Sequence, residues 1–372
     1  MRVDLGIDPY ELRSLNSPVS QGGLQQEGNN MIKTVGIVSL SSGVLGEPFI
    51  RHELELGVRR LQEMGLKVKF MEHTLAGAAY LKEHPEARAA DWLQAYEDDE
   101  VDLIMTAIGG DDTYRLLPYL FDHDELKNAV SDKPFLGFSD TTVNHLMLHR
   151  LGIPSFYGQA FLTEICELGK DMLPYSRACF EEFIETGRIS EIRPSPLWYE
   201  TRKSYGPDQL GTEAVSHPNT GFELLQGPPV FEGEILGGCI DTLFDLFDGT
   251  RYADSPAVCA KYGLFPAPDD WAGKILLLES SEEKPSPEKY RAALEHFKAA
   301  GVFQALSGIL IGKPQDEVYD REYRQILAET VDDPALPILC NLPVGHAMPR
   351  CILPLGVKAV VDAERQCIRF PE

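Results

Sequence analysis

The segment PFLGFSDTTVNHLMLHRL, residues 134–151, determines how we interpret the fold of this chain. It begins with a short apolar run, Pro134–Phe138, which has the composition of a buried strand. It ends with Thr141–Leu151, in which apolar residues recur at helical spacing. Only Ser139 and Asp140 separate the two parts. A strand that passes directly into a helix is the unit of an α/β fold, so we expect a parallel sheet covered by helices.

The same alternation continues on both sides of this segment. In the first half we predict the strands Val35–Leu40, Leu66–Phe70 and Val101–Ala107 and the helices Pro48–Met64, Glu86–Tyr96, Tyr114–Leu120 and Asp124–Val130. In the second half we predict the strands Val230–Gly238, Lys274–Glu279, Leu306–Gly312 and Ile338–Leu342 and the helices Ile240–Phe247, Pro287–Ala300 and Glu322–Val331. Residues 353–370 predict antiparallel strands with a turn at Asp362–Arg365.

Composition divides the chain into four parts. Residues 1–31 are rich in Gly, Ser, Gln and Asn and predict a poorly ordered tail, although Met31 is also a possible start of the protein. Residues 32–165 predict an α/β domain with a parallel sheet. Residues 166–228 contain a helical stretch and then a Pro- and Gly-rich run too long for an ordinary connector, so we predict a linker and lid-like loop. Residues 229–372 predict a smaller α/β domain with a mixed sheet.

The overall charge and the cysteines exclude several classes of protein. Lys and Arg number 34 against 58 Asp and Glu, which gives a net charge of −24. This argues against binding to nucleic acid or to anionic membranes, both of which need clustered basic charge. No apolar run of ~18 residues predicts a membrane span, and no secretory signal is recognisable. The seven cysteines are scattered without a CxxC pair, so we expect reduced thiols in a cytoplasmic protein and no metal site.

Ser139 lies on the tight turn between the predicted strand and helix. At such a turn a serine hydroxyl is exposed beside backbone N–H groups that favour a developing oxyanion, as in a catalytic nucleophile. The match to the G-x-S-x-G pattern is incomplete because Thr141 replaces the second glycine. The alternative is that Ser139 or Asp140 merely caps the helix.

A second turn, IGGDD at residues 108–112, follows the predicted strand Val101–Ala107. Its glycines allow a sharp turn that presents N–H groups, which suits half of an oxyanion hole. It also resembles the Gly-Gly-Asp phosphate loop of NAD kinases and phosphofructokinases, and its carboxylates suit magnesium. A purely structural glycine turn is the remaining interpretation.

Glu279 and His346 also lie at predicted strand ends. Glu279 is the last residue of KILLLE, where a carboxylate is desolvated unless it has a partner, or else starts a solvated loop. His346 follows another apolar strand within PVGHAMP, where a histidine is either catalytic or structural. The order Ser139, Glu279, His346 is that of a nucleophile, an orienting carboxylate and a base.

Seven segments in order give the chain a specific resemblance. They are IGG with LLPYL (108–120), KPFLGFSDTT (133–142), YGQA (157–160), FEGEILGGCIDTL (231–243), KILLLE (274–279), GVFQALSGILIGKP (301–314) and VGHAMPRCILPLG (344–356). Together they resemble the family of serine peptidases that includes LD-carboxypeptidases and the microcin C self-immunity proteins.

The resemblance implies roles for individual residues. Ser139 would be the nucleophile, Glu279 the orienting carboxylate and His346 the general base, and the N–H groups of Gly110 and Asp140 would form the oxyanion hole. It also implies a serine domain followed by a smaller domain with the Glu and His, a homodimer, and no metal or cofactor.

Three segments make the chain more similar to the immunity-protein branch than to the LD-carboxypeptidases. GGDD stands where LD-carboxypeptidases have GGYG, and the long loop carries SPLWYE and NTGFELLQG. The resemblance suggests Asp111, Trp198 and Asn219 as substrate-binding residues, with Trp198 otherwise a packing residue. Arg350 stands where many relatives have Asn, close to His346.

We therefore expect a serine carboxypeptidase-like hydrolase that cleaves an amide bond near a terminus, in a small peptide or a peptidyl- or aminoacyl-nucleotide. The first alternative is an LD-carboxypeptidase that trims muropeptides. Alternatives from other classes are a nucleotide-binding kinase that uses the GGDD turn and an inactive binding protein.

Overall fold

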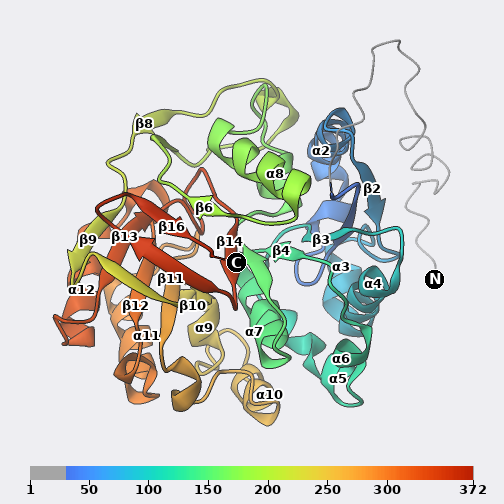
Figure 1. The fold of residues 1–372 in the computed structure, drawn as a ribbon. Coiled ribbons are helices and arrows are strands. Elements are labelled where there is room, and N and C mark those ends of the chain that lie inside the picture. The colour runs from blue at the N-terminus through green and yellow to red at the C-terminus, as the bar shows by residue number, and fades with distance from the viewer. Residues whose placement is uncertain (1–30, 372) are drawn as a thin grey trace.

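The computed structural model describes residues 31–371, which form two sheets that lie side by side and are flanked by helices (Figure 1). The predicted tail, residues 1–31, lies outside the described residues except for Met31. No helix of the described residues is both long and apolar enough to cross a membrane.

The first sheet has the strand order β14-β5-β4-β3-β1-β2. Its strands are β1 (Thr34–Val38), β2 (Lys67–Phe70), β3 (Leu103–Thr106), β4 (Phe135–Gly137), β5 (Ser155–Tyr157) and β14 (Leu353–Leu355). The first five run parallel, which confirms the predicted parallel sheet. Strand β14 comes from the C-terminal part of the chain and pairs antiparallel with β5. The sequence placed β14 among the C-terminal strands and missed this pairing.

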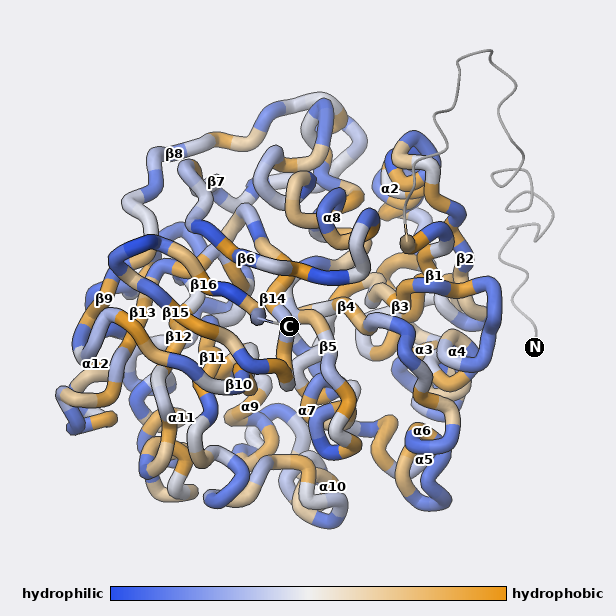
Figure 2. Tube along the Cα trace, viewed as in Figure 1, coloured by the Kyte–Doolittle hydropathy of each residue, from blue (hydrophilic) through white to orange (hydrophobic). Residues whose placement is uncertain are grey.

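Helices cover both faces of this sheet because side chains alternate along its strands. Leu103 and Met105 of β3 point into one apolar cluster, and Ile104 points into the other. The helices of this part are α2 (Arg51–Glu63), α3 (Ala78–Glu83), α4 (Pro85–Glu97), α5 (Leu117–Phe121), α6 (Glu125–Ala129) and α7 (Thr142–Arg150). Figure 2 shows the corresponding pattern, with apolar runs along the inner strands and polar residues on the outer loops.

The second sheet has the strand order β6-β16-β15-β10-β11-β12-β13-β9. Its strands are β6 (Glu191–Ile192), β9 (Glu223–Gln226), β10 (Val230–Cys239), β11 (Lys274–Glu279), β12 (Gly308–Gly312), β13 (Ile338–Leu342), β15 (Lys358–Asp362) and β16 (Cys367–Arg369). Strands β10 to β13 are parallel and the outer pairs are antiparallel, so the sheet is mixed as predicted. Its helices are α9 (Ile240–Asp245), α10 (Ser255–Lys261), α11 (Pro287–Ala299) and α12 (Asp320–Val331).

The segment 166–228 is more structured than a linker. It contains α8 (Pro174–Thr186) and a hairpin of β7 (Leu197–Tyr199) and β8 (Ser216–Pro218). It also supplies β6 and β9, which form the two edges of the second sheet. The sequence did not predict these strands because they are only two and four residues long and lie in a polar, Pro-rich run.

The carboxyl ends of β3, β4, β10 and β11 approach one another where the two sheets meet. The backbone N–H of Cys239, at the end of β10, donates to Thr142 Oγ1 at the start of α7 over 3.0 Å. In open α/β sheets the crevice outside the carboxyl ends of strands is the usual place for a ligand.

Candidate active site

Ser139 follows β4 in a strained conformation. Its φ is +66°, in the left-handed region that residues with a Cβ seldom adopt, and such strain concentrates at functional turns. Two hydrogen bonds hold it: its N–H donates to Tyr157 Oη over 3.1 Å, and its carbonyl accepts from Thr142 Oγ1 over 2.7 Å. Neither Ser139 nor Asp140 caps α7 with its side chain, so the capping interpretation is wrong.

The three residues that the sequence placed in the order of a triad come together. His346 Nε2 lies 3.1 Å from Ser139 Oγ, and His346 Nδ1 lies 2.8 Å from Glu279 Oε2. Glu279 also accepts from the backbone N–H of His346 over 3.2 Å, and its side chain is fully buried. The geometry is that of a nucleophile, a base and an orienting carboxylate.

Gly345 allows this approach between the loop after β13 and the end of β11. Its φ is +91°, and a Cβ there would lie 2.4 Å from Glu279 Oε2. A side chain at position 345 would therefore displace the Glu279 carboxylate, which contacts His346.

Tyr157 is the site residue whose role the sequence did not reveal. Its hydroxyl donates to Glu279 Oε1 over 2.6 Å and accepts from the N–H of Ser139. Burial and the adjacent Glu279 charge raise its pKa well above the usual value, so Tyr157 stays neutral and remains a donor. The motif YGQA was available as a signal, but only the fold brings Tyr157 within hydrogen-bond distance of Glu279.

Two carboxylates, Glu279 and Glu282, raise the pKa of the His346 ring. Burial acts to lower its pKa, but Glu279 and Glu282 outweigh it and raise the pKa to about 9. Glu282 Oε2 lies 2.9 Å from His346 Nε2, the nitrogen that also faces Ser139. The hydrogen bond to His346 in turn lowers the pKa of Glu282 to about 2.

Arg350 holds the loop that carries His346 through hydrogen bonds to its backbone. Its guanidinium donates to the carbonyls of Gly345 and His346 and pairs with the buried carboxylate of Glu164. The guanidinium also lies over the ring of Phe138, 4.5 Å from its centroid. Arg350 therefore fixes the backbone on which His346 is carried.

The turn at residues 108–112 packs directly against Ser139. A Cβ on Gly109 would lie 2.9 Å from Ser139 Oγ, and one on Gly110 would lie 2.2 Å from Ser41 Oγ. Asp112 forms a buried ion pair with Arg88 over 2.6 Å. This structural use of Asp112 argues against a phosphate loop or a magnesium site.

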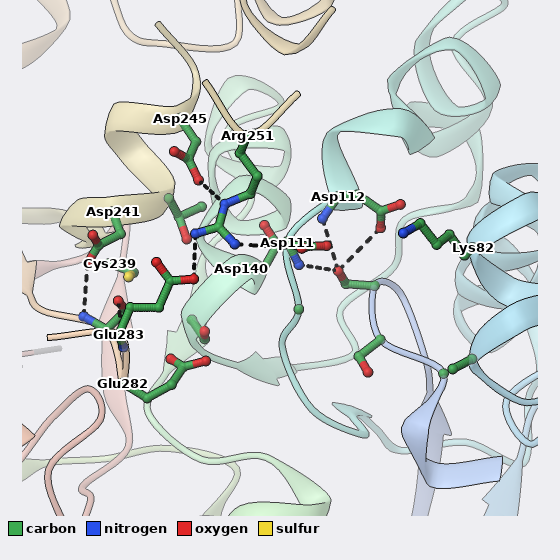
Figure 3. Close-up of a pocket in the computed structure, with 18 residues that line it drawn as sticks. Lys82, Asp111, Asp112, Asp140, Cys239, Asp241, Asp245, Arg251, Glu282 and Glu283 are labelled. Atoms are coloured by element: carbon green, nitrogen blue, oxygen red, sulfur yellow. Dashed lines mark hydrogen bonds and ion pairs between the residues drawn. The ribbon is translucent and has the colours of Figure 1, made fainter. Parts of the chain in front are cut away.

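A cavity of about 360 Å³ opens beside Ser139, and most of the charged residues in its walls are acidic (Figure 3). The charged residues that line it are Lys82, Asp111, Asp112, Asp140, Asp241, Asp245, Arg251, Glu282 and Glu283. Gly110 lines it as well, on the side of the predicted oxyanion hole.

The side-chain carboxylates of Asp140 and Asp111, which both line this cavity, have hydrogen-bond partners within the protein. Asp140 is buried and accepts from the N–H of Thr113 over 2.9 Å, and burial raises its pKa to about 6. Asp111 accepts from Tyr252 Oη over 3.0 Å and lies 3.6 Å from Arg251.

Trp198 and Asn219 are not among the residues that line this cavity. The Trp198 ring stacks on His217 with centroids 4.4 Å apart, and Lys313 Nζ lies 5.2 Å from its centroid. Asn219 donates to the carbonyl of Ser195 and accepts from Asn341, both over 3.0 Å. Both side chains are thus engaged within the protein.

In the described part of the chain, one set of side chains has the residue types and spacing of a metal site. Ligand atoms of Cys239, Glu279 and His346 lie within 4.8 Å of one another. Both oxygens of Glu279 and both ring nitrogens of His346 already have hydrogen-bond or ion-pair partners. The arrangement therefore fits proton transfer better than ligation.

Comparisons with known proteins find similar sequences and structures. Residues 35–158 match the family model of the LD-carboxypeptidase N-terminal domain, and residues 232–361 match that of the C-terminal domain. A putative carboxypeptidase of Treponema pallidum is 30% identical over 85% of this chain and 86% of its own length. The microcin C7 self-immunity protein of Escherichia coli is 26% identical over 85% of this chain and 87% of its own.

One solved structure is more similar to this chain than these two relatives are. It is an MccF-like protein from Streptococcus pneumoniae in complex with AMP, 57% identical, covering 92% of this chain and 99% of that protein with a TM-score of 0.90.

Proposed function

Because the chain belongs to the LD-carboxypeptidase family of serine-type carboxypeptidases, we propose that its substrate is an aminoacyl- or peptidyl-nucleotide, in which it hydrolyses the amide bond beside the nucleotide. The observation that carries this proposal is the AMP bound to the MccF-like protein with 57% identity. The cavity beside Ser139 has polar walls that suit the hydroxyl groups of a ribose.

The triad geometry supports a two-step mechanism. His346 accepts the Ser139 proton at Nε2 while Glu279 holds Nδ1, and Ser139 Oγ attacks the carbonyl carbon. We propose that the N–H groups of Gly110 and Asp140 stabilise the oxyanion. His346 then protonates the leaving group, and water attacks the acyl-enzyme by the same route.

The test compares two substrate classes on the purified full chain. One is a set of aminoacyl-sulfamoyl adenosines, in which a sulfamoyl group replaces the phosphate, and the other is a muropeptide that ends in D-alanine. We expect release of the nucleoside moiety, measured by liquid chromatography and mass spectrometry, and no release by Ser139→Ala. Cleavage of the muropeptide alone would overturn the nucleotide proposal in favour of cell-wall peptide trimming, which the family description also favours.

A further inference from the structure

Glu282 approaches the catalytic base from the side of the substrate cavity. Its Oε2 lies 2.9 Å from His346 Nε2, and Ser139 Oγ lies 3.1 Å from the same nitrogen. The Glu282 side chain is 63% exposed, whereas that of His346 is 7% exposed. A carboxylate that a ligand can reach therefore stands beside the attacking oxygen.

This contact blocks the base until another cation pairs with Glu282. With Glu279 on Nδ1 and Glu282 on Nε2, each ring nitrogen of His346 faces an acceptor, so the ring is held as imidazolium. An imidazolium has no lone pair to accept the Ser139 proton. Its pKa of about 9 keeps the ring in this state at neutral pH.

The other groups around His346 do not relieve this block. The Cys239 thiol and the Tyr157 phenol have pKa values raised well above the usual by burial and by Glu279, so both stay neutral. Arg350 binds the carbonyl of His346 rather than its ring, and the uncharged Phe138 ring packs against the imidazole.

The other cations that line the cavity do not form an ion pair with Glu282. Arg251 lies between three carboxylates, 2.7 Å from Glu283, 3.0 Å from Asp245 and 3.6 Å from Asp111. Lys82 lines the opposite end of the cavity (Figure 3). Within residues 31–371, the ion pair that Glu282 forms is the one with His346.

We propose that Glu282 binds a protonated α-amino group of the substrate and that this binding activates His346. A carbonyl carbon attacked by Ser139 Oγ carries its α-carbon one bond away, and an amine on that carbon reaches the carboxylate beside Nε2. The inference rests on the proposed function and assigns the acyl part of the substrate: an amino acid with a free α-amine, rather than a residue whose amine is already in a peptide bond.

The charges balance in this exchange. The substrate ammonium takes the place of the imidazolium beside Glu282, and the Nε2 proton of His346 leaves to water. The neutral ring then accepts a hydrogen bond from the Ser139 hydroxyl. One cation replaces another, and one proton is released for each substrate bound.

The experiment uses a pair of compounds that differ by one amine, alanyl- and propionyl-sulfamoyl adenosine. We expect the kcat/KM of the unmodified protein to be about 10–100-fold higher for the alanyl than for the propionyl compound. The propionyl compound lacks the charged amine that would bind Glu282. In Glu282→Gln the ratio of the two kcat/KM values, alanyl to propionyl, should be close to one. The matched control Glu283→Gln should keep the ratio, because Arg251 already neutralises Glu283.

The pH profile separates this role from a structural one. The propionyl compound has no amine that titrates in the range where His346 does, so its kcat/KM reports the free enzyme, and it should rise with pH until about 9 as His346 loses its proton. In Glu282→Gln the rise should move to lower pH by a unit or more. The variant should therefore exceed the unmodified protein on the propionyl compound at pH 7 while it loses activity on the alanyl compound.

Two results would overturn the inference. The first is an equal kcat/KM for both compounds in the unmodified protein. The second is an equal loss of kcat/KM on both compounds in Glu282→Gln, without a change in the pH profile. The pair alanyl- and propionyl-D-alanine is tested in parallel. Activity on the dipeptide pair alone overturns the nucleotide proposal and still measures the amine preference. Activity on neither pair overturns both proposals.

Discussion

At the scale of single residues, the site is a chain of hydrogen bonds in which each group fixes the next. Tyr157 connects the N–H of Ser139 to Glu279, Glu279 connects to His346, and His346 returns to Ser139 Oγ. Because this series of hydrogen bonds is closed and mostly buried, the loss of one donor leaves a neighbouring acceptor without a partner. Such a loss lowers the free energy of unfolding by more than the hydrogen bond itself contributes to it, because a buried polar group is left unpaired.

Tyr157→Phe tests this closed chain. The change removes the donor to Glu279 Oε1 and the acceptor for Ser139 N–H. We expect the free energy of unfolding to fall by about 1–3 kcal/mol and kcat by about 10-fold or more. Urea unfolding and steady-state kinetics measure the two effects. Tyr290→Phe, a buried tyrosine of α11, is the control, and an equal loss of kcat there would contradict a specific role for Tyr157.

The protonation of His346 predicts a pH dependence of stability. Its pKa is raised from 6.5 to about 9 on folding, so the stabilisation is complete below pH 6.5 and is lost as the pH rises to about 9. A rise of this size corresponds to about 3 kcal/mol. Melting temperatures between pH 6 and 10 should therefore fall more steeply for the unmodified protein than for His346→Gln. Parallel curves would show that the imidazolium adds nothing to stability.

At the scale of elements, loops at the ends of strands hold the catalytic groups in place. The loop that carries His346 is fixed by Arg350 from within, and by the β7–β8 hairpin, whose Tyr199 N–H donates to the Met348 carbonyl over 2.9 Å. The hairpin is thus hydrogen-bonded to the loop that carries His346.

Arg350→Met should remove much of this support. It leaves the buried Glu164 without its cation, so we expect a loss of about 3–5 kcal/mol in the free energy of unfolding together with a lower kcat. Lys358→Met is the matched control, because it breaks the exposed pair with Glu232, which contributes at most about 1 kcal/mol. Urea unfolding of both variants makes the comparison. A loss for Arg350→Met no larger than for Lys358→Met would contradict the account.

Trp198→Ala tests whether the hairpin acts as a lid. The ring is half-buried against His217 and Lys313, so its removal should lower the melting temperature by only a few degrees. If the hairpin closes over a bound nucleobase, KM for an aminoacyl-nucleotide analogue should rise several-fold and that for a dipeptide should not. Equal effects on both substrates would identify Trp198 as a packing residue.

Much of the site could be predicted because single residues carried local signals. Ser139, Glu279 and His346 each follow an apolar run that ends in a turn, and the segments around them have a recognisable order. Tyr157 and Glu282 could not be predicted in the same way. Their roles depend on distances between β5, β11 and the catalytic loop, which the sequence does not contain. The pairing of β14 with β5 was missed for the same reason.

At the scale of the whole molecule, two sheets each contribute part of one site. The first brings Ser139 and the turn at residues 108–112, and the second brings Glu279 and His346. Strand β14 joins the first sheet although it lies beyond β13 in sequence, so the chain crosses back between the two halves. The homodimer implied by the resemblance remains a prediction, and light scattering would confirm it by a mass of twice 41.4 kDa.

We propose that Ser139 forms the acyl-enzyme with His346 as its base. The most direct measurement is mass spectrometry of the protein quenched during turnover of an aminoacyl-sulfamoyl adenosine, with peptide mapping of the adduct. We predict an acyl adduct on Ser139, none in Ser139→Ala, and formation at least about 10³-fold slower in His346→Ala. An adduct on another residue, or full activity in Ser139→Ala, would contradict the account.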